Sequence, residues 1–186
     1  RGTGLRFRQP NDVGIASDDT IYLSDPDWSS PEEGRIFMIT PPPRRRTVLL
    51  DEGLNTPNGI TVSPDDRRVY VAPSLRNNIL VYDRCPDGTL HYKRVFIDLR
   101  AHWIPTYAMP DGMRCDVRGN LYVAMFRLGR ILIIGPDGTL HPKAIQTIGH
   151  RPANLTFCGA DCRTLCIAEK EQGRIEQVRV AYLGIR

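Results

Sequence analysis

The chain has 186 residues and a net charge of +4, with 41% hydrophobic and 25% charged residues, which is the composition of an ordinary globular protein. Its longest apolar runs, such as residues 131–134, are too short to cross a bilayer, so no membrane partner is expected. The one basic cluster, Arg44-Arg45-Arg46, has no interleaved aromatic residues that could stack bases, and we expect no nucleic-acid binding.

The first ten residues predict the end of a preceding structural unit. Leu5 and Phe7 alternate with Arg6 and Arg8, as in a half-buried strand. The sequence begins at Arg1 and not at Met, so we expect part of the molecule to lie upstream, where a targeting signal would also lie.

From there the chain repeats one pattern four times. Each copy has an Asn or Asp beside a proline, then a short alternating strand, a turn rich in Asp or Gly, and a second apolar strand. The polar anchors of the copies are Asn11, Asn58, Asp111 and Asn154. They recur about every 45 residues, the length of one four-stranded propeller blade.

Strands are predicted in chain order within each copy, and helix signals are nearly absent because β-branched residues at period two dominate. The expected strands are residues 13–16, 21–24, 34–39 and 47–50; 60–62, 69–71 and 79–82; 121–124 and 131–134; and 165–168 and 174–180. We therefore predict an all-β propeller of about four blades, with residues 1–186 forming a single domain that is incomplete at its N-terminus.

The turns between the first two strands of each copy hold Asp19, Asp66, Gly119 and Cys162. If these turns need a positive φ, Asp costs little there and Cys costs about 1 kcal/mol. The five cysteines lack the paired spacing of a zinc site, so we expect them to be reduced and packed as small apolar side chains.

The sequence resembles the senescence-marker-protein, gluconolactonase and luciferin-regenerating-enzyme superfamily of six-bladed β-propellers. The resemblance covers essentially the whole chain. Its motifs are Pro10-Asn11-Asp12-Val13 with Ser24-Asp25-Pro26, Pro57-Asn58-Gly59-Ile60-Thr61-Val62-Ser63-Pro64-Asp65, Pro110-Asp111-Gly112-Met113, and Pro152-Ala153-Asn154 with Arg163-Thr164-Leu165.

The resemblance implies a lactone hydrolase with one divalent metal at the centre of the ring, usually calcium, with zinc, magnesium or manganese in some members. It implies Asn58 and Asp111 as metal ligands and Asn11 as a contact to metal-bound water or substrate. The family's glutamate ligand has no counterpart in this sequence. Where some members carry an arginine for sugar-acid lactones, this chain has Gln9, with Arg8 one place away.

The types of residue at the anchors suit this chemistry, whether or not the resemblance is considered. Inner propeller strands begin at the central channel, so anchors far apart in sequence converge there, and amide and carboxylate oxygens are hard ligands suited to calcium or magnesium. Asp111 is the candidate general base, with metal-bound hydroxide as the alternative. For each anchor alone, a turn in which Asn or Asp precedes Gly is the competing interpretation.

Aromatic residues in the loops near the expected channel mouth offer either a substrate wall or packing between blades. Trp103 and Tyr107 are assigned to substrate binding, with Trp28 and His102 nearby. Asp25 is expected to cap a loop, and His91, His141 and His150 to face solvent. No nucleophile elbow is present, so a covalent serine mechanism is not expected.

These observations together predict a metal-dependent lactone hydrolase acting on a small-molecule lactone, of which this fragment alone lacks the glutamate and would be inactive. The alternative is a non-catalytic propeller that binds a small molecule or a protein through its channel face. A cytoplasmic location is favoured over a secreted or periplasmic one, and the oligomeric state is not predicted.

Overall fold

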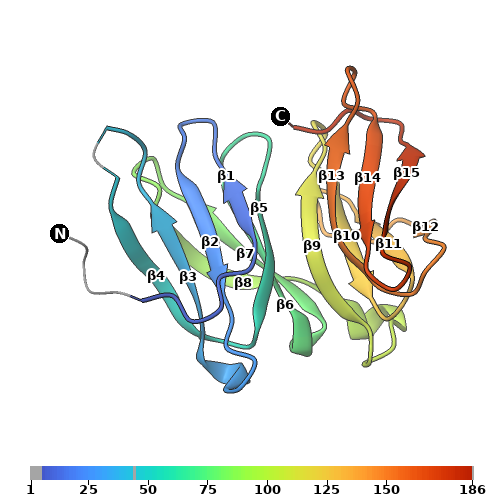
Figure 1. Ribbon diagram of the computed structural model, residues 1–186. Coiled ribbons are helices and arrows are strands. Elements are labelled where there is room, and N and C mark those ends of the chain that lie inside the picture. Colours follow the sequence, from blue (N-terminus) through green and yellow to red (C-terminus); the bar gives the residue numbers. More distant parts are fainter. Residues whose placement is uncertain (1–5, 44, 186) are drawn as a thin grey trace.

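A computed structural model describes residues 6–43 and 45–185, and their regular structure is almost entirely β. Four antiparallel sheets lie side by side, each built from a consecutive stretch of chain (Figure 1). The predicted all-β propeller is confirmed. No helix among the described residues is long and apolar enough to cross a membrane.

Each sheet is a propeller blade in which the strands follow chain order from the inside outward. Blade 1 contains β1 (Val13–Ile15), β2 (Ile21–Asp25), β3 (Gly34–Ile39) and β4 (Thr47–Leu54). Blade 2 contains β5 (Pro57–Val62), β6 (Arg68–Pro73), β7 (Asn78–Arg84) and β8 (Leu90–Asp98).

Blade 3 contains β9 (Met109–Cys115), β10 (Leu121–Phe126), β11 (Arg130–Ile134) and β12 (Ile145–Gln146). Blade 4 has three strands in the described residues, β13 (Pro152–Cys158), β14 (Thr164–Glu169) and β15 (Arg174–Arg179). Three short 3-10 helices, η1 (Pro31–Glu33), η2 (Ser74–Arg76) and η3 (Leu99–His102), connect strands or blades.

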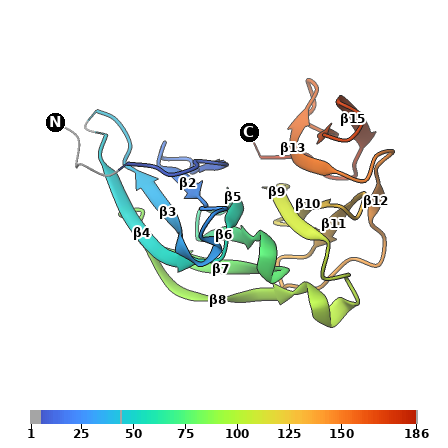
Figure 2. The same ribbon diagram turned by 60° about the horizontal axis from the view of Figure 1, so that its bottom comes forward.

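The inner strands β1, β5, β9 and β13 meet at the centre of the molecule, and the blades follow an arc around them (Figure 2). Neighbouring blades are held together by three apolar cores, one at each junction. At the junction of blades 1 and 2, for example, Tyr22 and Ile36 pack with Ile60 and Val71. Each blade therefore buries its apolar faces against its neighbours, as repeat architectures require.

Glycine lets the inner strands approach one another. A Cβ atom built on Gly59 in β5 would lie 2.1 Å from the carbonyl oxygen of Asp111 in β9. One built on Gly112 in β9 would lie 2.7 Å from the Cα of Asn154 in β13. Both distances are impossible for a real side chain, so glycine is required there by backbone proximity.

The predicted turn geometry is confirmed at all four blades. Asp19, Asp66, Gly119 and Cys162 have φ values of 64°, 58°, 82° and 50°. Cys162, which lacks the local hydrogen bonding of Asp, is the most strained of the three non-glycine residues.

Two expectations about local structure are wrong. The described residues 6–10 form no strand; the backbone N–H groups of Arg8 and Gln9 instead donate to the buried Asp25 carboxylate, while Leu5 lies outside the described residues. The expected loop-capping role of Asp25 is thereby confirmed.

The second error concerns the cysteines. Cys158 in β13 and Cys166 in β14 form a disulfide, because the antiparallel register places their Cα atoms 6.1 Å apart. The expectation of reduced thiols holds for Cys85, Cys115 and Cys162.

Candidate metal and catalytic centre

The anchors Asn58 and Asp111 lie at the same end of two adjacent inner strands. Asn58 is the second residue of β5 and Asp111 the third residue of β9, and neither has a positive φ. The turn interpretation is therefore wrong for both. The glycine that follows each anchor serves the close approach of strands described above.

The side chains of Asn58 and Asp111 touch. The Asn58 side chain donates a hydrogen bond to the Asp111 carboxylate, which also accepts from the backbone N–H of Gly112. Burial, and then the nearby negative charge of Asp12, raise the pKa of Asp111 to about 7, while Lys170 acts in the opposite direction. The neighbouring positive charge is therefore too weak to offset the effect of burial and of Asp12 on the ionised Asp111 carboxylate.

Asn58 contributes a second feature. Its side chain is only 5% exposed, and its Oδ1 atom has no hydrogen-bond partner among the described residues. A buried carbonyl oxygen without a partner is unfavourable unless a ligand satisfies it. An unpartnered amide oxygen beside a carboxylate is the donor set that a hard divalent cation takes.

The donor set is partial. Among residues 6–43 and 45–185, no three His, Cys, Asp or Glu side chains come together as a metal site. The amide oxygen of Asn58 and the carboxylate of Asp111 fit a calcium-type ion, and further oxygen ligands would have to come from water, substrate or other residues.

Sequence reasoning missed the most connected polar residue of the channel, Asp12. Its carboxylate, 5% exposed, accepts from the Ile60 backbone N–H at 3.3 Å, from Arg114 at 3.3 Å and from the Asn154 side chain at 3.5 Å. Asp12 therefore links all four blades. The alternation in the sequence points the other way: Val13 and Ile15 are the apolar residues of this stretch, yet they are 40% and 59% exposed, while Asp12, Gly14 and Ala16 are buried.

Asn154 joins the cluster through Asp12, whereas Asn11 does not. Asn11 is exposed, and its backbone N–H donates to Ser24. Its neighbour Asp12 takes the buried position because successive residues in an extended chain point in opposite directions. A substrate contact by Asn11 stays a prediction.

The predicted aromatic wall lies on the segment that connects blades 2 and 3. Trp103 follows η3 with a φ of 61° and is 95% exposed, and Tyr107 is 58% exposed. The alternative interpretation, that these two side chains pack between blades, is therefore wrong. Their contact with substrate remains a prediction, and His102 is exposed beside them.

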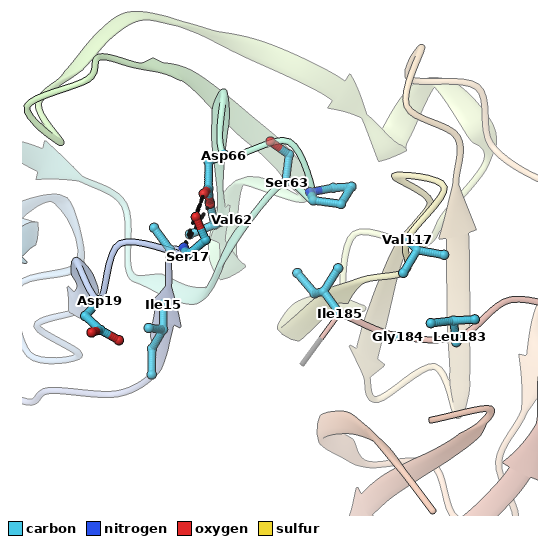
Figure 3. Close-up of a pocket in the computed structure, with 12 residues that line it drawn as sticks. Ile15, Ser17, Asp19, Val62, Ser63, Asp66, Val117, Leu183, Gly184 and Ile185 are labelled. Carbon is cyan, nitrogen blue, oxygen red and sulfur yellow. Dashed lines mark hydrogen bonds between the residues drawn. The ribbon is translucent and has the colours of Figure 1, made fainter. Parts of the chain in front are cut away.

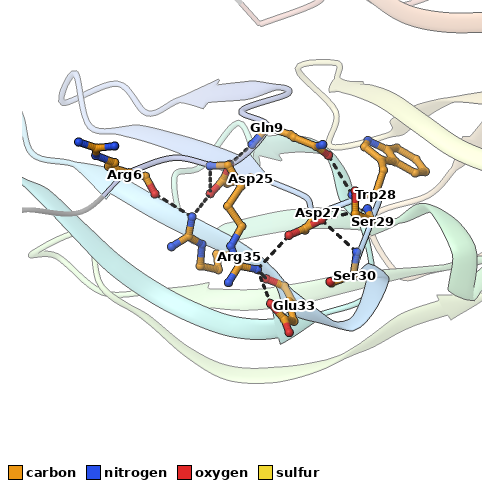
Figure 4. A network of polar contacts seen from close by, with 10 residues as sticks. Arg6, Gln9, Asp25, Asp27, Trp28, Ser29, Ser30, Glu33 and Arg35 are labelled. Carbon is orange, nitrogen blue, oxygen red and sulfur yellow. Dashed lines mark hydrogen bonds and ion pairs between the residues drawn. The ribbon is translucent and has the colours of Figure 1, made fainter.

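In the N-terminal segment, the Gln9 side chain contacts the loop after β2 (Figure 4). The Gln9 side-chain oxygen accepts from the Trp28 backbone N–H at 2.9 Å, and the Arg8 guanidinium pairs with Asp27 and Glu33. Both side chains hold the loop after β2 in place.

A pocket of about 590 Å³ lies at the opposite ends of the inner strands, where the turns of blades 1 and 2 face the C-terminal segment (Figure 3). Ile15, Val62 and Ile185 line it, and its polar residues Ser17 and Asp66 bond to each other. It contains none of the predicted site residues.

A β-propeller with oxygen donors converging where its inner strands begin is the class of protein that the fold and the site define. The chain belongs to the family described as the SMP-30/Gluconolactonase/LRE-like region, whose model matches residues 3–170.

Its relatives agree with this assignment. The chain is 32% identical to a gluconolactonase of Zymomonas mobilis, over 97% of this chain and 53% of that protein. Among solved structures, it is similar to a luciferin-regenerating enzyme (TM-score 0.83, 17% identity, 95% of this chain and 63% of that one). It is also similar to a gluconolactonase from Xanthomonas campestris (TM-score 0.72, 25% identity, 90% and 56%). The chain spans about half the length of the curated relatives it matches.

Proposed function

We propose that the protein containing this chain is a metal-dependent lactone hydrolase. The observation that carries the proposal is the contact between Asn58 and Asp111, in which a buried amide oxygen without a partner lies beside a carboxylate of raised pKa. The family and the gluconolactonase relatives support the same reaction class.

Asn58 and Asp111 would hold the cation, for which we propose calcium because both residues offer hard oxygen ligands. When bound, such an ion supplies polarisation of the lactone carbonyl and lowers the pKa of a water molecule.

Asp111 is also the candidate general base. With a pKa near 7 in the absence of a cation, its carboxylate could accept a proton from the attacking water at neutral pH. A bound cation would depress that pKa and weaken the base, so the choice between Asp111 and metal-bound hydroxide stays open. Asp12 and Arg114 keep the neighbouring strand ends fixed in either case.

The test is a panel of sugar and alkyl lactones, assayed with chelator and with calcium, magnesium, manganese or zinc restored. The protein is used with any sequence that naturally flanks residues 1–186. We expect hydrolysis that chelator abolishes and metal restores, and a loss of at least about 100-fold in kcat/KM in Asp111→Ala.

The chain offers a matched control for that substitution. Asp137 lies in a second Pro-Asp-Gly sequence, at the exposed hairpin turn of the same blade, and Asp137→Ala should keep full activity. If Asp111→Ala remains fully active, the role assigned to Asp111 fails. If a ligand binds without metal and without turnover, the enzyme proposal fails and the binding-module alternative replaces it.

A further inference from the structure

Two cations lie over one aromatic ring beside the candidate centre. The Nζ atom of Lys170 is 5.9 Å from the centroid of the Phe126 ring, and the Cζ atom of Arg151 is 6.0 Å from it. Phe126 ends β10, where it pairs with Met109 in β9, two residues before Asp111. The ring therefore places both cations at the same end of the inner strands as the candidate centre.

Lys170 forms no ion pair with the part of the chain that the structure describes. None of the ion pairs formed within residues 6–43 and 45–185 includes Lys170 or Arg151. The Lys170 ammonium group lies over the Phe126 ring, and Phe126 pairs with Met109, two residues before Asp111. The ammonium charge therefore lies at the end of β9 that carries Asp111.

The acidic residues nearest the two cations are occupied elsewhere. The Glu169 carboxylate accepts the backbone N–H groups of Arg151, Glu171 and Gln172. Glu171 accepts the backbone N–H of His150 at 2.7 Å, and the charge of Arg151 helps to lower its pKa. Arg151 is thereby partly compensated, and Lys170 is the principal available positive charge.

We propose that Lys170, assisted by Arg151, binds an anionic substituent of the substrate. This inference rests on the proposed lactonase function and narrows its substrate class to lactones that carry a second, negatively charged group, such as a phosphate, sulfonate or carboxylate. The ammonium of Lys170 and the guanidinium of Arg151, both over the Phe126 ring, offer charge-assisted hydrogen bonds to such a group. In this arrangement the lactone carbonyl would lie at Asp111.

The experiment compares glucono-δ-lactone with its 6-phosphate, after subtraction of spontaneous hydrolysis, in the protein with its natural flanking sequence. We expect the wild type to prefer the phosphorylated lactone by at least about tenfold in kcat/KM. Lys170→Met should remove most of that preference, measured as the ratio of the two kcat/KM values within the same variant. Lys170→Arg should retain the preference, because it keeps the charge.

Lys143→Met is the matched control, since it removes the same charge from an exposed lysine on the segment between β11 and β12. It should leave the preference unchanged. Equal kcat/KM values for the two lactones in the wild type, or an unaltered preference in Lys170→Met, would overturn the inference.

A binding measurement separates this inference from the proposed function. Calorimetry with 6-phosphogluconate and with gluconate needs no turnover, and we expect the phosphate to strengthen binding about tenfold in the wild type but not in Lys170→Met. Hydrolysis of neither lactone, together with this binding difference, would reject the lactonase and keep the anion site. Hydrolysis of both lactones without a binding difference would keep the lactonase and reject the anion site.

Discussion

Asp111 is a carboxyl group whose surroundings disfavour its ionised form. Its pKa of about 7 lies above the ordinary value of 3.8, chiefly because the group is buried and also because Asp12 is close. Its stabilising contribution is therefore fully present below pH 3.8 and is lost as the pH rises through 7. Above pH 7, the folded protein carries the free-energy cost of an ionised, buried Asp111 carboxylate. A cation bound at Asn58 and Asp111 would reduce that cost, so metal binding would stabilise the folded protein.

This effect can be measured in metal-free protein. Between pH 4 and pH 8, the free energy of unfolding of Asp111→Asn should rise relative to wild type by on the order of 3 kcal/mol, because one pKa unit corresponds to about 1.4 kcal/mol. Urea unfolding with chelator present, at a series of pH values, provides the measurement. Asp137→Asn, at an exposed turn, should show no such rise, and a pH-independent difference for Asp111→Asn would contradict the assigned pKa.

At the scale of the strand, the inner elements show why Asn58 and Asp111 are each followed by glycine. The N-terminal halves of β5, β9 and β13 run so close together that the backbone of one strand fills the space where a Cβ of its neighbour would be. This proximity is what brings Asn58 and Asp111 into contact although more than fifty positions separate them in the chain.

Gly59→Ala tests this packing. Its Cβ would lie 2.1 Å from a backbone oxygen, which a rotamer change cannot relieve, so we expect a loss of about 3 kcal/mol or more in stability. Gly173→Ala is the control: that residue has a φ of 63° and no atom within 4 Å of the added Cβ, so only about 1 kcal/mol of backbone strain is expected. Thermal or urea unfolding of both variants measures the two losses of stability. Equal losses would contradict the close approach of β5 and β9.

At the scale of the whole molecule, the channel polar cluster ties the blades together. Asp12 of blade 1 and Arg114 of blade 3 form an ion pair at 3.3 Å across blade 2, and Asn154 brings in blade 4. The apolar cores join only neighbouring blades, so this pair supplies a contact of a different kind, between blades that are not adjacent.

A double-mutant cycle of Asp12→Asn and Arg114→Met measures that contact. We expect a coupling energy of about 1–2 kcal/mol, below the roughly 3–5 kcal/mol lost when a fully buried pair is broken, because the Arg114 side chain is 25% exposed. Urea unfolding of the four proteins gives the value. Strict additivity would mean that the pair does not hold the blades together.

The resemblance to the family singled out Asn58 and Asp111 together, and the sequence by itself determined the all-β propeller, the four repeats and the turn residues of positive φ. These features follow from local rules, since strand alternation, turn chemistry and repeat length act over a few residues or at a constant spacing. Only the tertiary structure decided that Asp12 and not Asn11 is buried, that Arg114 reaches Asp12, that Lys170 lies over the Phe126 ring and that Cys158 pairs with Cys166. Each of those facts depends on which side chains meet between strands, and no periodicity within a single strand contains that information.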